Sequence, residues 1–191
     1  MKIARLLICL LMVAWATSYA GELVVNGGFE DVLGEQSAVG WTFTPAASGS
    51  DFFYGSDGLP VHAGNNAAQF GGTSTGYYDS ISQVLSTVVG DSYRFSFLLY
   101  GYDGSDNGQI VYWDGNQVLN LTNFTQGYTF YSFDEIASGA STTIAFAGYN
   151  VPSWNGVDDV SVQGTIPEPA TFALIAPALL GLVALRRRFS R

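Results

Sequence analysis

Apolar and polar side chains alternate one by one along much of this chain, in segments that end at Gly, Asn, Asp or Ser. The clearest example contains Tyr93, Phe95 and Phe97 at every second position, and the pattern recurs at 144–146 and 160–162. Successive side chains of a β-strand point to opposite faces, so such residues share one face, which we expect in the core. This period of two predicts a chain built mainly of β-strands.

The expected strands are short and separated by turn signals. They lie near 22–25, 40–44, 51–54, 66–70, 78–88, 92–101, 108–114, 117–122, 128–135, 142–149 and 157–163. Asp114-Gly115-Asn116 is a good hairpin turn, because Gly and Asn tolerate positive φ. About ten strands at this spacing favour an all-β, two-sheet antiparallel sandwich. No capped amphipathic helix is apparent between residues 21 and 164.

The N-terminus has the three parts of a secretory signal peptide. Lys2 and Arg5 form a basic start, residues 6–14 are apolar, and small residues precede an expected cleavage after Ala20. The alternative, a buried N-terminal helix, leaves the basic start and the small residues unexplained. The only cysteine, Cys9, lies in this leader, so the processed chain is expected to have no disulfide.

The C-terminus combines a short motif, an apolar segment and a basic end. Pro167-Glu168-Pro169 precedes the uncharged segment 172–185, and Arg186-Arg187-Arg188 follow it. A helix over 170–185 would be about 24 Å long, slightly shorter than a bilayer core, and its arginines can reach the lipid head groups. Arginines stay cytoplasmic, which leaves residues 21–164 outside. A plain membrane anchor explains all of this except the Pro-Glu-Pro motif.

These C-terminal residues closely resemble the PEP-CTERM sorting signal of Gram-negative bacteria. The resemblance covers about the last 26 residues and includes the motif, the hydrophobic span and the Arg cluster in that order. It implies processing by an exosortase and, for many members, a link to extracellular polysaccharide and biofilm. We therefore expect a signal peptide at 1–20, a sandwich domain at 21–164 and a sorting signal at 165–191. The protein would be exported through the inner membrane, then anchored by its tail or released to the surface or matrix.

The domain between the two ends is strongly acidic. From residue 21 to residue 164 there are 15 Asp and Glu against a single Arg, Arg94, which gives a formal charge of −14. Phosphate binding depends on Lys and Arg, so this domain is not expected to bind nucleic acid or anionic lipid head groups.

Short motifs at both ends of the domain resemble galactose-binding-like jelly rolls, a group that includes many carbohydrate-binding modules. They are LVVNGGFE at 23–30, Gly40-Trp41, and GVDDVSV at 156–162. The resemblance implies a jelly-roll sandwich whose first and last strands lie side by side. Many such domains bind sugars, whereas others have adhesive or unknown roles.

The first and last strands bring Glu30 towards Asp158 and Asp159. Asp158 alternates with Val160 and should point inward, where a carboxylate needs a metal or backbone amides as partner. By the same resemblance, a structural calcium ion is expected at Glu30 and Asp158, with Asp159 as a further ligand. The alternative is that these carboxylates cap backbone N–H groups. A second acidic segment, 103–108, lacks the closing Glu of an EF-hand loop and is expected to be a solvated turn.

Sugar binding requires exposed aromatic rings next to amides or carboxylates. The sequence offers Trp154, Trp113, Tyr149, Tyr102 and Tyr112 as candidates. Trp154 lies among Asn, Pro and Ser residues and is the best candidate for an exposed ring, whereas Trp41 is expected in the core.

Catalytic residues are scarce between the leader and the tail. His62 is the only histidine, and this part of the chain has no lysine or cysteine. We therefore expect a non-catalytic surface or matrix protein that binds extracellular polysaccharide. The first alternative is a structural biofilm-matrix or adhesion protein without a sugar site. A glycoside hydrolase or lyase is a distant alternative, since the sequence cannot show two carboxylates facing each other.

Overall fold

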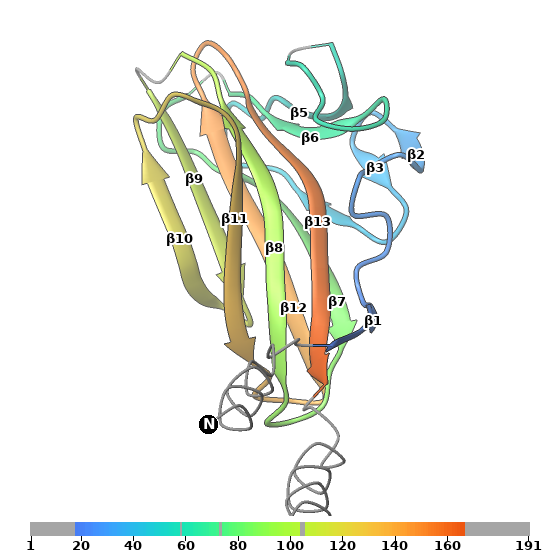
Figure 1. Ribbon diagram of the computed structural model, residues 1–191. Coiled ribbons are helices and arrows are strands. Elements are labelled where there is room, and N and C mark those ends of the chain that lie inside the picture. The colour runs from blue at the N-terminus through green and yellow to red at the C-terminus, as the bar shows by residue number, and fades with distance from the viewer. Residues whose placement is uncertain (1–17, 58, 73, 104–105, 167–191) are drawn as a thin grey trace, which may run out of the picture. The chain divides into compact units, whose positions relative to one another are not determined.

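The computed structural model describes residues 18–57, 59–72, 74–103 and 106–166, and these form only strands, turns and loops. Two main antiparallel sheets make up the fold (Figure 1). The expected all-β sandwich is therefore confirmed. The helices expected in the leader and at about 170–185 lie outside the described residues. Within the described ranges, no helix is long and apolar enough to cross a membrane.

The first sheet has the order β11-β8-β13-β6-β5 and the second the order β10-β9-β12-β7-β4. The strands of the first sheet are β11 (Gln126–Ile136), β8 (Ser92–Gly101), β13 (Asn155–Ile166), β6 (Ala67–Phe70) and β5 (Phe52–Gly55). Those of the second are β10 (Asn116–Thr122), β9 (Asn107–Trp113), β12 (Ser141–Asn150), β7 (Asp79–Ser86) and β4 (Thr42–Thr44). β2 (Val32–Gly34) and β3 (Ser37–Ala38) form a small separate hairpin. β1 (Ser18–Glu22) is followed by Leu23, whose N–H donates to the carbonyl of Val162 in β13 at 2.9 Å.

The core lies between the two sheets, and the alternation of the sequence explains which residues fill it. In β8 the side chains of Phe95, Phe97 and Leu99 are completely buried, as are those of Ile144 and Phe146 in β12. The rings of Phe97 and Phe146, from opposite sheets, meet edge to face with centroids 5.1 Å apart. Trp41 is also buried there, as expected. The two patterns found in the sequence therefore pack against each other.

The turn between β9 and β10 forms where the sequence predicts it. Asp114 and Gly115 have φ values of 48° and 79°, and Trp113 pairs with Asn116. This is a two-residue hairpin loop, which requires positive φ at both central positions.

The β2–β3 hairpin was not expected from the sequence. Its strands have only three and two residues, and all but one of their side chains are exposed. Such short, exposed strands show no alternation of apolar and polar residues, so periodicity cannot find them.

Candidate functional site

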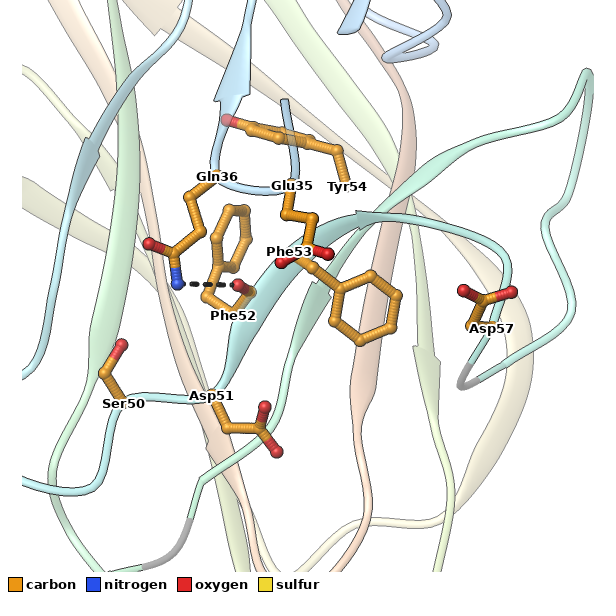
Figure 2. A pocket seen from close by; sticks show the side chains of 8 residues that line it. All are labelled: Glu35, Gln36, Ser50, Asp51, Phe52, Phe53, Tyr54 and Asp57. Atoms are coloured by element: carbon orange, nitrogen blue, oxygen red, sulfur yellow. Dashed lines mark hydrogen bonds between the residues drawn. The ribbon is translucent and has the colours of Figure 1, made fainter. Parts of the chain in front are cut away.

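A pocket of about 320 Å³ lies beside β5, at the edge of the first sheet (Figure 2). It is lined by Glu35, Gln36, Ser50, Asp51, Phe52, Phe53, Tyr54 and Asp57. These residues come from the β2–β3 turn, from β5 and from the loops on either side of β5.

The β2–β3 hairpin forms one wall of the pocket because it is hydrogen-bonded to β5. The side-chain amide of Gln36 donates to the carbonyl of Phe52 at 3.1 Å, and the N–H of Tyr54 donates to the carbonyl of Glu35 at 2.7 Å. Phe52 and Tyr54 alternate inward and are buried, whereas Phe53 points to the other face of the strand and is half-buried. The strand pleat therefore leaves Phe53 as the partly exposed aromatic ring among the pocket residues.

Three carboxylates line the same pocket as this ring. Figure 2 shows the side chains of Glu35, Asp51 and Asp57 around Phe53, and all three acidic residues are exposed. Carboxylate oxygens accept hydrogen bonds from hydroxyl groups, and an aromatic ring can stack on the apolar face of a sugar. The pocket thus combines the two kinds of group that sugar binding requires.

A buried carboxylate, Asp79 of β7, fixes one side of the pocket. It is 1% exposed and accepts hydrogen bonds from the N–H of Ala46 at 2.7 Å, the hydroxyl of Ser50 at 2.7 Å and the N–H of Asp51 at 3.1 Å. Asp79 therefore positions two residues of the pocket wall. No pattern in the sequence indicates this role, because the loop and β7 are far apart along the chain.

Trp154, the best sequence candidate, lies next to the pocket but does not line it. Its ring is half-buried and meets the ring of Phe53 almost at right angles, with centroids 6.2 Å apart. A Cβ atom on Gly71 would lie only 2.4 Å from its indole nitrogen, so this glycine makes room for it. Trp154 therefore supports Phe53 from the side instead of presenting a free ring face.

Two further aromatic candidates, Trp113 and Tyr149, lie elsewhere. Trp113 is 2% exposed and packs 5.9 Å from Phe95, so it belongs to the core and offers no face to a ligand. Tyr149 is 7% exposed and meets Tyr78 edge to face at 4.9 Å. Burial raises the pKa of Tyr149. Trp154, Trp113 and Tyr149 therefore pack against different rings and do not form one exposed aromatic surface.

Glu30 and Asp158 both hold the segment 62–66. Asp158 is completely buried, as its inward phase predicts, and its Oδ2 accepts from the N–H groups of His62 at 2.9 Å and Ala63 at 3.2 Å. Glu30 Oε1 accepts from the N–H groups of Asn65 at 2.8 Å and Asn66 at 2.9 Å. Two carboxylates from the opposite ends of the domain thus fasten one loop.

Asp159 completes this arrangement from β13. Its Oδ2 lies 2.6 Å from Nδ1 of His62. Burial is the main cause that raises the pKa of Asp158, although the backbone N–H groups that it binds act in the opposite direction.

These contacts match the capping alternative for Glu30 and Asp158. Their oxygens face N–H donors, and the described part of the chain contains no group of three His, Cys, Asp or Glu side chains placed to hold a metal ion. Calcium at Glu30, Asp158 and Asp159 stays a prediction.

The two packed sheets define the class: a jelly-roll sandwich of the kind found in carbohydrate-binding modules. TmCBM61, solved in complex with β-1,4-galactotriose, is similar with 18% identity and a TM-score of 0.51, over 75% of this chain and 98% of that one. A structure described as CBM4 has 18% identity and a TM-score of 0.50, over 74% of this chain and 99% of that one.

The sandwich also occurs within larger proteins. The enzymatically active domain of bacteriophage CBA120 tailspike protein 4 has 15% identity and a TM-score of 0.56, over 76% of this chain. The match spans only 21% of the tailspike chain. No curated protein matches this chain.

Residues 165–188 match the PEP-CTERM protein-sorting motif. The resemblance predicted from Pro167-Glu168-Pro169 and Arg186-Arg187-Arg188 is therefore confirmed. This motif implies export and sorting at the membrane.

Proposed function

We propose that this chain is an exported, non-catalytic surface or matrix protein of a Gram-negative bacterium, whose sandwich binds a neutral extracellular polysaccharide at the pocket beside β5. One observation carries the proposal: a half-buried aromatic ring, Phe53, lies among the carboxylates of Glu35, Asp51 and Asp57. The fold class and the sorting motif support it, since carbohydrate-binding modules share the sandwich and the motif implies export.

The charge of the domain favours a neutral polymer. Three carboxylates at the pocket and a formal charge of −14 over residues 21–164 would repel uronic acids or sulfated sugars. Hydroxyl groups of neutral sugars can donate to the carboxylates without this repulsion. The ligand class is therefore a neutral polysaccharide.

The tail would direct sorting after export. In this proposal an exosortase recognises Pro167-Glu168-Pro169 and processes the chain, which is held by segment 172–185 until then. Replacing the three motif residues by alanine should leave the chain unprocessed, and the same replacement of Pro45 and Pro60 should not. Gel mobility of the whole chain in a bacterium with an exosortase reads out processing, and normal processing of the motif variant would contradict the role.

Polysaccharide binding is tested with the whole chain in affinity gels that contain neutral or acidic polymers. Phe53→Ala should weaken binding to the neutral polymer at least about tenfold, which corresponds to about 1.4 kcal/mol. Phe130→Ala is the matched control, because Phe130 is 64% exposed on β11, the opposite edge strand of the same sheet. Retention by no polymer, or equal loss in both variants, would favour the structural matrix alternative.

A further inference from the structure

The turn between β7 and β8 has an unusual composition. In this turn the N–H of Asp91 donates to the carbonyl of Val88 at 3.1 Å, and Gly90 has a φ of 83°. Val88 and Val89 are 60% and 63% exposed. Exposed turns usually contain Gly, Pro, Asn, Asp or Ser, so two neighbouring valines here present apolar surface to the outside.

Ile136, at the end of β11, extends this apolar surface. It is 66% exposed, and the next residue, Ala137, is joined to the turn by two hydrogen bonds. The N–H of Ala137 donates to the carbonyl of Asp91 at 3.0 Å, and the N–H of Gly90 donates to the carbonyl of Ala137 at 2.9 Å. We call Val88, Val89 and Ile136 the apolar tip.

The apolar tip lies at the end of the sandwich where the domain's last residue leaves it. Gly164 of β13 pairs with Tyr93 of β8. Ile136 of β11 pairs with Ser92, the residue before Tyr93 in β8. Figure 1 shows the end of β13, the start of β8 and the end of β11 together at one end of the sheet. The other end of β13 pairs with β6, which leads to β5 and the pocket.

The chain length between the domain and the apolar tail is short. Seven residues separate Gly164 from Phe172, where the uncharged segment begins. Even fully extended, they span at most roughly 25 Å. A tail inserted in a bilayer therefore keeps this end of the sandwich close to the lipid surface.

We propose that the apolar tip rests on the bilayer surface while the tail is inserted, so that the pocket at the other end of β13 faces away from the membrane. This inference rests on the membrane-inserted tail of the proposed function. The occupant is a phospholipid surface of low negative charge, because exposed Asp91 adjoins the tip and the domain has no lysine. Valine and isoleucine side chains contribute apolar contact with the acyl boundary.

The test uses the leader-processed chain with its tail, in vesicles of phosphatidylcholine that contain a brominated phospholipid. Cys9 is lost with the leader, so a single cysteine can be placed at Val88 and labelled with a fluorophore. Val84→Cys is the matched control, since Val84 is also valine, is 70% exposed and lies in β7 within the sheet. We expect at least twofold stronger quenching at position 88 than at position 84.

The outcomes separate this inference from the proposed function. Flotation of the chain with the vesicles reports tail insertion, independently of the label. Flotation with equal quenching at both positions overturns the inference and leaves the sorting role intact. Failure to float overturns both. Disulfide-linked dimers of the same Val88→Cys chain left unlabelled would show that a second copy covers the tip, and would overturn the inference. A second comparison places the label at position 91 through Asp91→Cys. Replacing the three residues of the apolar tip by serine (Val88→Ser, Val89→Ser and Ile136→Ser) should weaken the quenching of this label relative to the Asp91→Cys chain alone. Unchanged quenching contradicts the inference.

Discussion

Asp79 is a single residue on which the pocket depends. Its carboxylate is buried and receives three hydrogen bonds from the loop 46–51. Asp79→Ala would leave these donors unpaired, at a cost of about 1–3 kcal/mol of unfolding free energy. Urea denaturation of the whole chain measures this loss. Asp79→Asn keeps one acceptor and should lose less, and an equal loss in both variants would show that packing alone decides the effect.

Glu30 holds the segment 62–66 by hydrogen bonds to Asn65 and Asn66, and its contribution to stability depends on pH. Desolvation raises its pKa, but the N–H groups of Asn66 and Asn65 together lower it more, so the pKa lies below the ordinary 4.5. A lowered pKa in the folded state contributes stability above the ordinary value, and this contribution is lost as the pH falls through the folded-state pKa. Glu30→Gln should therefore lower the melting temperature at about pH 7 and much less at about pH 3.

Asp158 fastens the same loop, but its pKa shift and the pH dependence of its contribution to stability have the opposite sign. Burial raises its pKa, so the folded state binds the proton more tightly and the stability contributed by Asp158 grows as the pH falls.

Asp31→Asn is the control for Glu30→Gln, because it removes one charge of the same sign at the next position. A pH-independent loss in Glu30→Gln would contradict the role of the charge.

At the scale of elements, the junction of the first and last strands depends on Gly27. The N–H of Val160 donates to the carbonyl of Gly27 at 2.9 Å, and a Cβ at position 27 would lie only 1.9 Å from the carbonyl oxygen of Val160. Gly27→Ala should therefore separate the strands and lower the unfolding free energy by about 1–3 kcal/mol or more. Gly28→Ala is the matched control, since its Cβ would have no neighbour closer than 3.9 Å. Equal urea midpoints for the two variants would show that the junction yields easily.

For the whole molecule, charge repulsion is the dominant electrostatic effect. With a formal charge of −14 over residues 21–164, the melting temperature should rise between low salt and about 0.15 M salt, where the screening length falls to about 8 Å. If Glu30 and Asp158 act only as caps of backbone N–H groups, calcium at matched ionic strength should add no further rise. A further rise that a chelator reverses would instead support the calcium site, and a melting temperature independent of salt would contradict the repulsion.

The sequence predicts the sandwich fold of the domain but not the pocket. Glu35, Asp51, Phe53 and Asp57 look like ordinary turn and strand residues. Glu35 joins the other three, which lie in or beside β5, only because the β2–β3 hairpin is hydrogen-bonded to β5. The aromatic candidates Trp154, Trp113 and Tyr149 lie outside this pocket for a related reason. Whether a ring such as Trp113 faces the core or a ligand depends on which strand packs over it.

Local patterns were enough for the strands, the β9–β10 turn and the sorting motif, because alternation, turn chemistry and a contiguous signal each involve neighbours along the chain. The inward position of Asp158 followed from the same alternation. The hydrogen-bond partners of Asp158 did not follow from it, because the segment 62–66 reaches this carboxylate only through the tertiary fold. Hydrogen bonds and pockets join residues that are distant in sequence, and packing of the two sheets decides which of them meet.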